Sequence, residues 1–133
     1  MVSDYVGIPF LDCGMDRDKG LSCWGLVRFV YREEFGVDLP TYQGDTIHPD
    51  EHEMIEGMVS NVMDNGTWTS VPEPKMYDVV LMNFAKHPVH IGLYVETDGL
   101  LHTLPKYESV RERLSSCQWA KRVVGYWRHT SQL

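Results

Sequence analysis

The sequence contains little cysteine, and its cysteines are poorly placed for structural cross-links. Its 133 residues include three, Cys13, Cys23 and Cys117, an odd number with no Cys-x-x-Cys pair. Disulfide frameworks and structural zinc sites need paired or clustered cysteines. We therefore expect neither kind of stabilisation, and a chemical role for one of the thiols stays open.

Clustered positive charge and long apolar runs are also missing. The formal net charge is −7 with no run of Lys or Arg, so nucleic acid is not an expected partner. The apolar stretches are too short to span a bilayer, and Asp4 interrupts the start where a signal peptide would begin. We expect no membrane anchor, synthesis in a bacterial cytoplasm, and exit by a route other than the standard secretion signal.

What is present is typical of one globular domain. Hydrophobic residues make up 43% and charged residues 23%, and the chain is long enough for a single core. Neither an internal repeat nor a low-complexity tract is visible. We predict one domain over residues 1–133.

The first half of the sequence predicts helices. Residues 22–35 carry apolar side chains at helical spacing, with Ser22 as N-cap and Gly36 as the residue that ends the helix. A second apolar stripe predicts a helix over about 49–64, ended by Asn65-Gly66. Residues 67–76, which include Pro72 and Pro74, are predicted to form a loop.

The second half predicts an antiparallel sheet. Short β-branched and aromatic runs at 77–84, 89–96, 100–105 and 122–129 are typical of strands, and Asp98-Gly99 indicates a hairpin turn. Helices followed by such strands predict an α+β fold, with N-terminal helices packed on an antiparallel sheet.

Cys23 is placed where a thiol can be activated. In the first turn of the predicted helix it lies among backbone N–H groups that lack intrahelical acceptors, and the helix dipole favours its thiolate. Gly25 would let other backbone or a substrate approach closely. The alternative is that Cys23 is a small buried core residue, as most free cysteines are.

His90 and His102 are the candidate partners of this thiol. Both fall within predicted strands of one hairpin, where one imidazole could act as base and the other could orient it. A two-residue turn at Asp98-Gly99 would place them on opposite faces. A three-residue loop over 97–99 would restore one face, with His102 opposite Tyr94, and a bulge would still be needed to bring the rings together.

The sequence gives less reason to assign a chemical role to the remaining histidines. His48 and His52 could hold a metal on one helix face, but no third ligand is apparent, and a solvated acidic helix start is the better interpretation. His87 lies in a turn and His129 near the end of the sequence, neither with an evident partner. We expect no metal and no cofactor.

Taken together, these motifs resemble the NlpC-type cell-wall cysteine peptidases, a papain-like group. The matching runs are "YVGIPFLDCG", "LSCWGLVRFVYREEFGVDLP", "HIGLYV", "LLHTLP" and "GYWRH". The similarity covers nearly the whole chain, and Trp24 after the cysteine is similar to the branch found in tail-tip assembly proteins of long-tailed phages and related gene-transfer particles.

The resemblance implies roles for individual residues. Cys23 would be the nucleophile, His90 the base and His102 the orienting residue. The expected oxyanion and pocket residues are Ser22, Trp24, Asp12, Phe10 and Tyr5. Phe10 stands where many members have a Tyr, Ser22 where the family usually has Asp, and Cys13 where Gly is common.

The resemblance also implies an activity. We expect a hydrolase of peptidoglycan stem peptides that cleaves between a D-glutamyl residue and a diamino acid, carried on a phage-like tail tip with hub proteins as partners. One alternative is a structural tail subunit with a weak or silent peptidase pocket. Another is an acyltransferase on the same fold.

Overall fold

The arrangement of the chain is known from a computed structural model, which describes residues 2–11, 14–39, 67–84, 87–103, 107–116 and 119–132. The N-terminal elements are the 3-10 helix η1 (Val2–Tyr5), the strands β1 (Met15–Asp16) and β2 (Gly20–Leu21), and the helix α1 (Cys23–Phe35). The sheet strands are β3 (Trp68–Val71), β4 (Val79–Phe84), β5 (His87–Val95), β6 (Gly99–His102), β7 (Val110–Arg113) and β8 (Val123–His129). Two 3-10 helices, η2 (Ala120–Arg122) and η3 (Thr130–Gln132), flank β8.

Local sequence determines where α1 begins and ends. The Ser22 hydroxyl accepts a hydrogen bond from the Gly25 N–H at 3.0 Å, and Gly36 adopts the left-handed conformation that closes the C-terminus. The prediction of this helix, with both of its caps, is confirmed.

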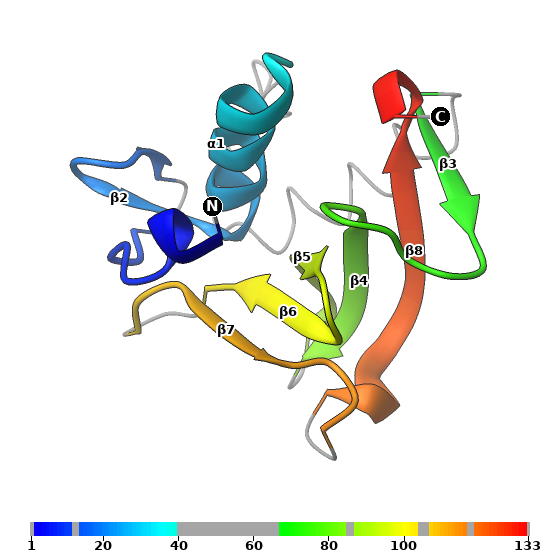
Figure 1. Cartoon of the computed structure of the whole chain (residues 1–133). Helices are drawn as coiled ribbons and strands as arrows, with labels where there is room; N and C mark the ends of the chain where they lie inside the picture. The colour runs from blue at the N-terminus through cyan, green and yellow to red at the C-terminus, as the bar shows by residue number, and fades with distance from the viewer. Residues whose placement is uncertain are drawn as a thin grey trace.

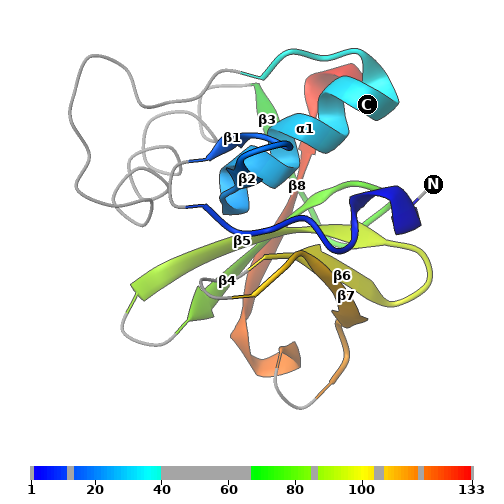
Figure 2. The same ribbon diagram turned by 90° about the vertical axis from the view of Figure 1, so that its left-hand side faces the viewer.

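The sheet is antiparallel with the strand order β3-β8-β4-β5-β6-β7. Figure 1 shows that it is strongly coiled, so that β6 and β7 run across the direction of β8. In Figures 1 and 2, α1 and the β1–β2 hairpin lie together on one side of it. The predicted α+β class, with helix packed on an antiparallel sheet, is confirmed.

The two faces of the sheet bury different sets of side chains. Ile91, Leu93 and Val95 of β5 join the main core with the apolar face of α1. The alternate positions of the sheet contribute to a second cluster that includes Leu100 and Trp119. This alternation places His90 and His102 at strand positions that do not point into the main core.

The structure corrects one predicted element, adds a strand that was not predicted, and leaves one predicted helix untested. Residues 68–71 form β3 rather than a loop, because they pair with the distant strand β8 and Trp68 packs against Trp24. The strand β7 was not predicted, because "VRER" is a charged edge strand without a period-2 pattern. The helix predicted at 49–64, with His48 and His52, lies outside the described residues.

In the portion of the chain described, no helix combines the length and apolarity that crossing a membrane requires.

Candidate active site

The N-terminus of α1 carries the sulfur of Cys23 to the end of the β5–β6 hairpin. Cys23 is 8% exposed, and its Sγ lies 3.5 Å from Nδ1 of His90 and 3.3 Å from the carbonyl oxygen of Thr103. The thiol is therefore next to an imidazole nitrogen, at a distance suited to proton transfer between them.

His90 continues this contact to a second imidazole. Its Nε2 lies 2.9 Å from Nδ1 of His102, and both histidines are almost completely buried. The structure thus brings together the three side chains that the sequence singled out, in the order Cys23, His90, His102.

The hairpin register explains how the two rings meet. Val95 pairs with Gly99, so the loop is Glu96–Asp98 and its left-handed residue is Asp98, with φ of 55°. Both turn registers considered from the sequence are therefore wrong. In the observed register His102 lies opposite Gly92, on the face to which His90 also points.

Gly92 provides the space for this approach. A Cβ at Gly92 would lie 3.0 Å from the Cβ of His102 and 2.9 Å from Cδ1 of Leu100. The glycine, rather than a bulge in the hairpin, allows the His102 ring to lean across β5 toward His90.

Two further residues, which the sequence did not reveal, complete the site. Nε2 of His102 lies 2.6 Å from Oε2 of Glu112 on β7, and the indole N–H of Trp119 donates to the same oxygen at 2.7 Å. The Trp119 ring also stacks on His90, at 5.9 Å between centroids, and meets His102 edge-on at 4.6 Å. Their roles depend on β7 pairing beside β6, which no local sequence signal indicates.

Burial lowers the pKa of His102 below its ordinary value, while the hydrogen bond and charge of Glu112 act in the opposite direction. The imidazole is therefore biased toward its neutral form, in which one nitrogen donates and the other accepts. A neutral His102 is what an orienting residue beside His90 requires.

Ser22 and Trp24 have structural positions that differ from the pocket roles expected of them. The Ser22 hydroxyl caps α1 and donates to the carbonyl oxygen of Gly14 at 3.1 Å. Trp24 is 0% exposed and packs in the core, with its ring 6.3 Å from that of Trp68. Both are fully buried and hold the helix tip in place.

Tyr5 packs beside α1, and its role as a pocket residue stays a prediction. Its ring packs edge-on against Phe29, and burial together with Glu34 raises its pKa to about 12. Glu34 lies about three turns along α1 from Cys23, roughly 16 Å at a rise of about 1.5 Å per residue. The Tyr5 hydroxyl therefore lies toward the end of α1 that is far from the sulfur.

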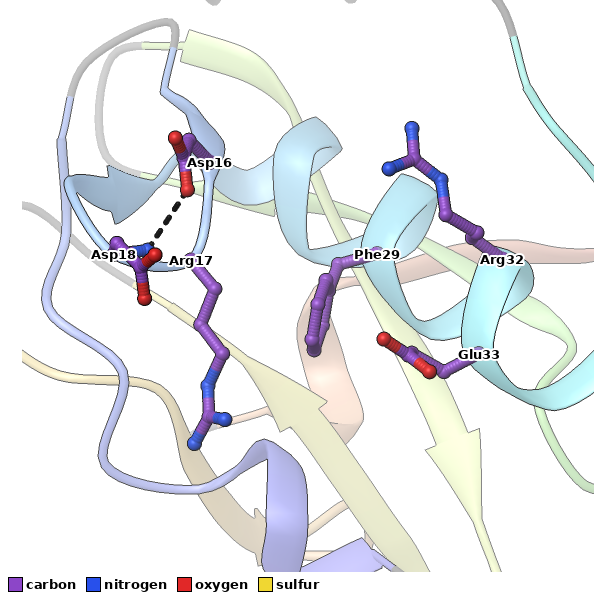
Figure 3. A pocket seen from close by; sticks show the side chains of 6 residues that line it. All are labelled: Asp16, Arg17, Asp18, Phe29, Arg32 and Glu33. Atoms are coloured by element: carbon purple, nitrogen blue, oxygen red, sulfur yellow. Dashed lines mark hydrogen bonds between the residues drawn. The ribbon is translucent and has the colours of Figure 1, made fainter.

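A groove and a smaller neighbouring hollow lie beside α1, and Tyr5 lines the smaller one. A groove of about 530 Å³ is lined by Asp16, Arg17, Asp18, Phe29, Arg32 and Glu33 (Figure 3). A neighbouring hollow of about 280 Å³ shares three of these residues and adds Asp4 and Tyr5. Figure 3 shows Arg17 beside the Phe29 ring, and its guanidinium lies 5.9 Å from the ring centroid.

Phe10 remains close to the helix tip through the backbone. It is half-buried against the main core and forms a parallel bridge with Leu21, two residues before Cys23. Its role as a pocket residue stays a prediction. Asp12, Cys13 and Cys117 lie outside the described residues.

Comparison with known proteins assigns the chain to a family. The profile of the NlpC/P60 family matches residues 7–128. The chain belongs to the NlpC/P60 family. The fold agrees with this assignment, since the NlpC/P60 domain of the peptidoglycan hydrolase SagA superposes with a TM-score of 0.59 at 20% identity, covering 95% of this chain and 90% of that one.

Two further proteins that are similar to this NlpC/P60 chain are longer than it. A Staphylococcus aureus Mu50 protein similar to lipoproteins of the NLP/P60 family gives a TM-score of 0.61 at 21% identity, over 96% of this chain and 38% of that one. The Escherichia coli K12 protein named Murein DD-endopeptidase MepS/Murein LD-carboxypeptidase is 24% identical over 122 residues, which are 90% of this chain. The chain spans 55% of the length of that curated relative.

Proposed function

We propose that this NlpC/P60 chain is a cysteine peptidase that hydrolyses peptidoglycan stem peptides. The observation that carries the proposal is the unbroken series of contacts from Cys23 Sγ through His90 to His102. Family membership and the murein-cleaving and peptidoglycan-hydrolysing relatives support the substrate class.

The proposed reaction has two stages. The Cys23 thiolate attacks an amide carbonyl, and backbone N–H groups at the start of α1 stabilise the oxyanion that forms. The His90 imidazolium protonates the leaving amine as the C–N bond breaks, which leaves a thioester. His90 then takes a proton from water, whose oxygen attacks the thioester and releases the carboxylate and the thiol.

We also propose that the bond cleaved joins a D-glutamyl residue to a diamino acid, as the resemblance of the sequence motifs implies. The name of the Escherichia coli relative refers to DD-endopeptidase and LD-carboxypeptidase activities. Cleavage at the D-glutamyl bond, at a DD bond or at an LD bond gives products of different mass, so one experiment can distinguish the three activities.

The decisive test is mass spectrometry of muropeptides released from purified sacculi by the wild-type chain and by Cys23→Ala. We expect fragments cut after D-glutamate with the wild type and none with the variant. Equal release by both proteins would contradict the role of Cys23, and a DD or LD product pattern would contradict the proposed bond.

The resemblance of the Cys23-Trp24 motif to tail-tip proteins supports a further proposal, that the chain is carried on a phage-like tail. Proteomics of purified particles from the source bacterium should then detect it together with tail and hub proteins. Its absence from intact particles, with detection in the cell envelope, would contradict tail carriage. The close thiol–imidazole contacts favour an enzyme over a purely structural tail subunit.

A further inference from the structure

Glu112 stands at the far end of the series of contacts that begins at Cys23. Its Oε2 lies 2.6 Å from His102 Nε2 and also accepts the indole N–H of Trp119 at 2.7 Å. Its side chain is 37% exposed, so Glu112 reaches the surface while its carboxylate contacts a fully buried imidazole.

We propose that Glu112 is a positioning residue that fixes the protonation pattern of both imidazoles, so that the bare Nδ1 of His90 faces the thiol. This inference rests on the proposed function, because it assumes that His90 exchanges a proton with Cys23.

The argument follows from what each atom can donate or accept. A carboxylate only accepts hydrogen bonds, so His102 must present Nε2–H to Glu112. A neutral His102 then has a bare Nδ1, which can only accept, and Nε2–H of His90 must donate to it. A neutral His90 is left with a bare Nδ1, the atom that lies 3.5 Å from Sγ of Cys23.

The alternative pattern leaves a contact unmade. If His102 carried its proton on Nδ1, its bare Nε2 would face the oxygens of Glu112, and two acceptors would oppose each other at 2.6 Å. Trp119 supports the proposed pattern, because its indole N–H can only donate and so holds Oε2 in place as an acceptor.

The charge of Glu112 also acts on the state formed when the thiol loses its proton. A proton on His90 makes an imidazolium, which a neutral His102 and the carboxylate beyond it stabilise. Among the residues that the structure describes, the titratable and charged groups in contact with the two rings or with Trp119 include Cys23 from α1, Glu112 from β7, and Arg122 from η2, whose guanidinium lies 5.5 Å from the Trp119 ring. Within this described set, Glu112 is the group that supplies a negative charge to His102.

The experiment compares Glu112→Gln with Glu108→Gln, an exposed acidic residue near the start of β7, which gives a control of equal charge change. We expect Glu112→Gln to slow alkylation of Cys23 at neutral pH by about 10- to 100-fold and to move its pH–rate profile to higher pH. Glu108→Gln should stay within about twofold of the wild type. A Glu112→Gln profile that overlays the wild-type profile would overturn the inference.

A second measurement needs no variant and so holds even if Glu112→Gln fails to fold. Nitrogen-15 NMR of histidine-labelled wild-type protein should find His102 protonated at Nε2 and bare at Nδ1. The opposite tautomer would overturn the inference. Neither readout uses peptidoglycan, so a chain that shows both effects but releases no muropeptide would contradict the proposed substrate and leave the role of Glu112 standing.

Discussion

Gly92 has no side chain, and this absence decides where His102 can lie. The histidine is opposite the glycine in the hairpin and one side-chain position along from His90 on the same face. Imidazoles in such diagonal positions meet only when the intervening side chain leaves room. The catalytic arrangement therefore depends on a residue that takes no part in the chemistry.

Replacement of Gly92 by alanine should disable the site more than the fold. The added Cβ would lie 3.0 Å from the Cβ of His102, which can move only if its ring moves as well. We expect hydrolysis to fall by about 100-fold, the loss associated with a misplacement of about 1 Å, with a stability cost of about 1–3 kcal/mol.

Gly125→Ala in β8 is the matched control, because its nearest neighbour would be 3.9 Å away. Kinetics and thermal melts of the two variants check the prediction. A Gly92→Ala protein as active as Gly125→Ala would contradict it.

At the level of the elements, α1 was predictable because its signals are local. Its apolar spacing, its serine cap and the glycine that ends it all lie within fifteen residues of sequence. Cys23, His90 and His102 could be singled out for the same reason, since a helix start and strand residues are recognisable from nearby sequence.

What could not be predicted depends on pairing between distant segments. The strand β3 exists because β8 lies beside it, and Glu112 reaches His102 because β7 pairs with β6. The register of the β5–β6 hairpin was also missed, because the three-residue loop is 96–98 rather than 97–99, with Asp98 in the left-handed conformation.

The start of α1 is held by close backbone contact, which gives a second prediction. A Cβ on Gly25 would lie 2.0 Å from the carbonyl oxygen of Gly14, which also accepts hydrogen bonds from the N–H and hydroxyl of Ser22. Gly25→Ala should therefore destabilise the fold by about 3 kcal/mol or more. Loss of the cap in Ser22→Ala should cost less, roughly 1 kcal/mol.

Chemical denaturation of the two variants compares these costs. A Gly25→Ala protein as stable as the wild type would show that the helix tip does not depend on this contact. It would then weaken the account of how Cys23 is placed.

At the scale of the whole molecule, histidines whose pKa is lowered by folding should make stability depend on pH. Burial lowers the pKa of His102 and also that of His129 in the folded chain, so the unfolded chain binds protons more readily. Stability should be complete above the ordinary histidine pKa and fall as the pH drops toward the lowered values. Each such proton contributes at most about 1.4 kcal/mol per pH unit.

Thermal melts from about pH 7.5 down to about pH 5.5 test this sign. The wild type should lose stability with falling pH, and His102→Asn should show a shallower slope, to which His129 still contributes. A wild-type melting temperature that is flat or that rises toward acid would contradict the assignment of His102 as a neutral buried imidazole.

The central claim is that this fold activates one particular sulfur atom. The most direct measurement is the alkylation rate of each cysteine, resolved by mass spectrometry between about pH 5 and 9, in the wild type and in His90→Ala. We predict that Cys23 reacts faster than Cys117 near neutral pH and that this advantage disappears without His90. Equal rates at the two cysteines, or a Cys23 rate unchanged in His90→Ala, would contradict the account.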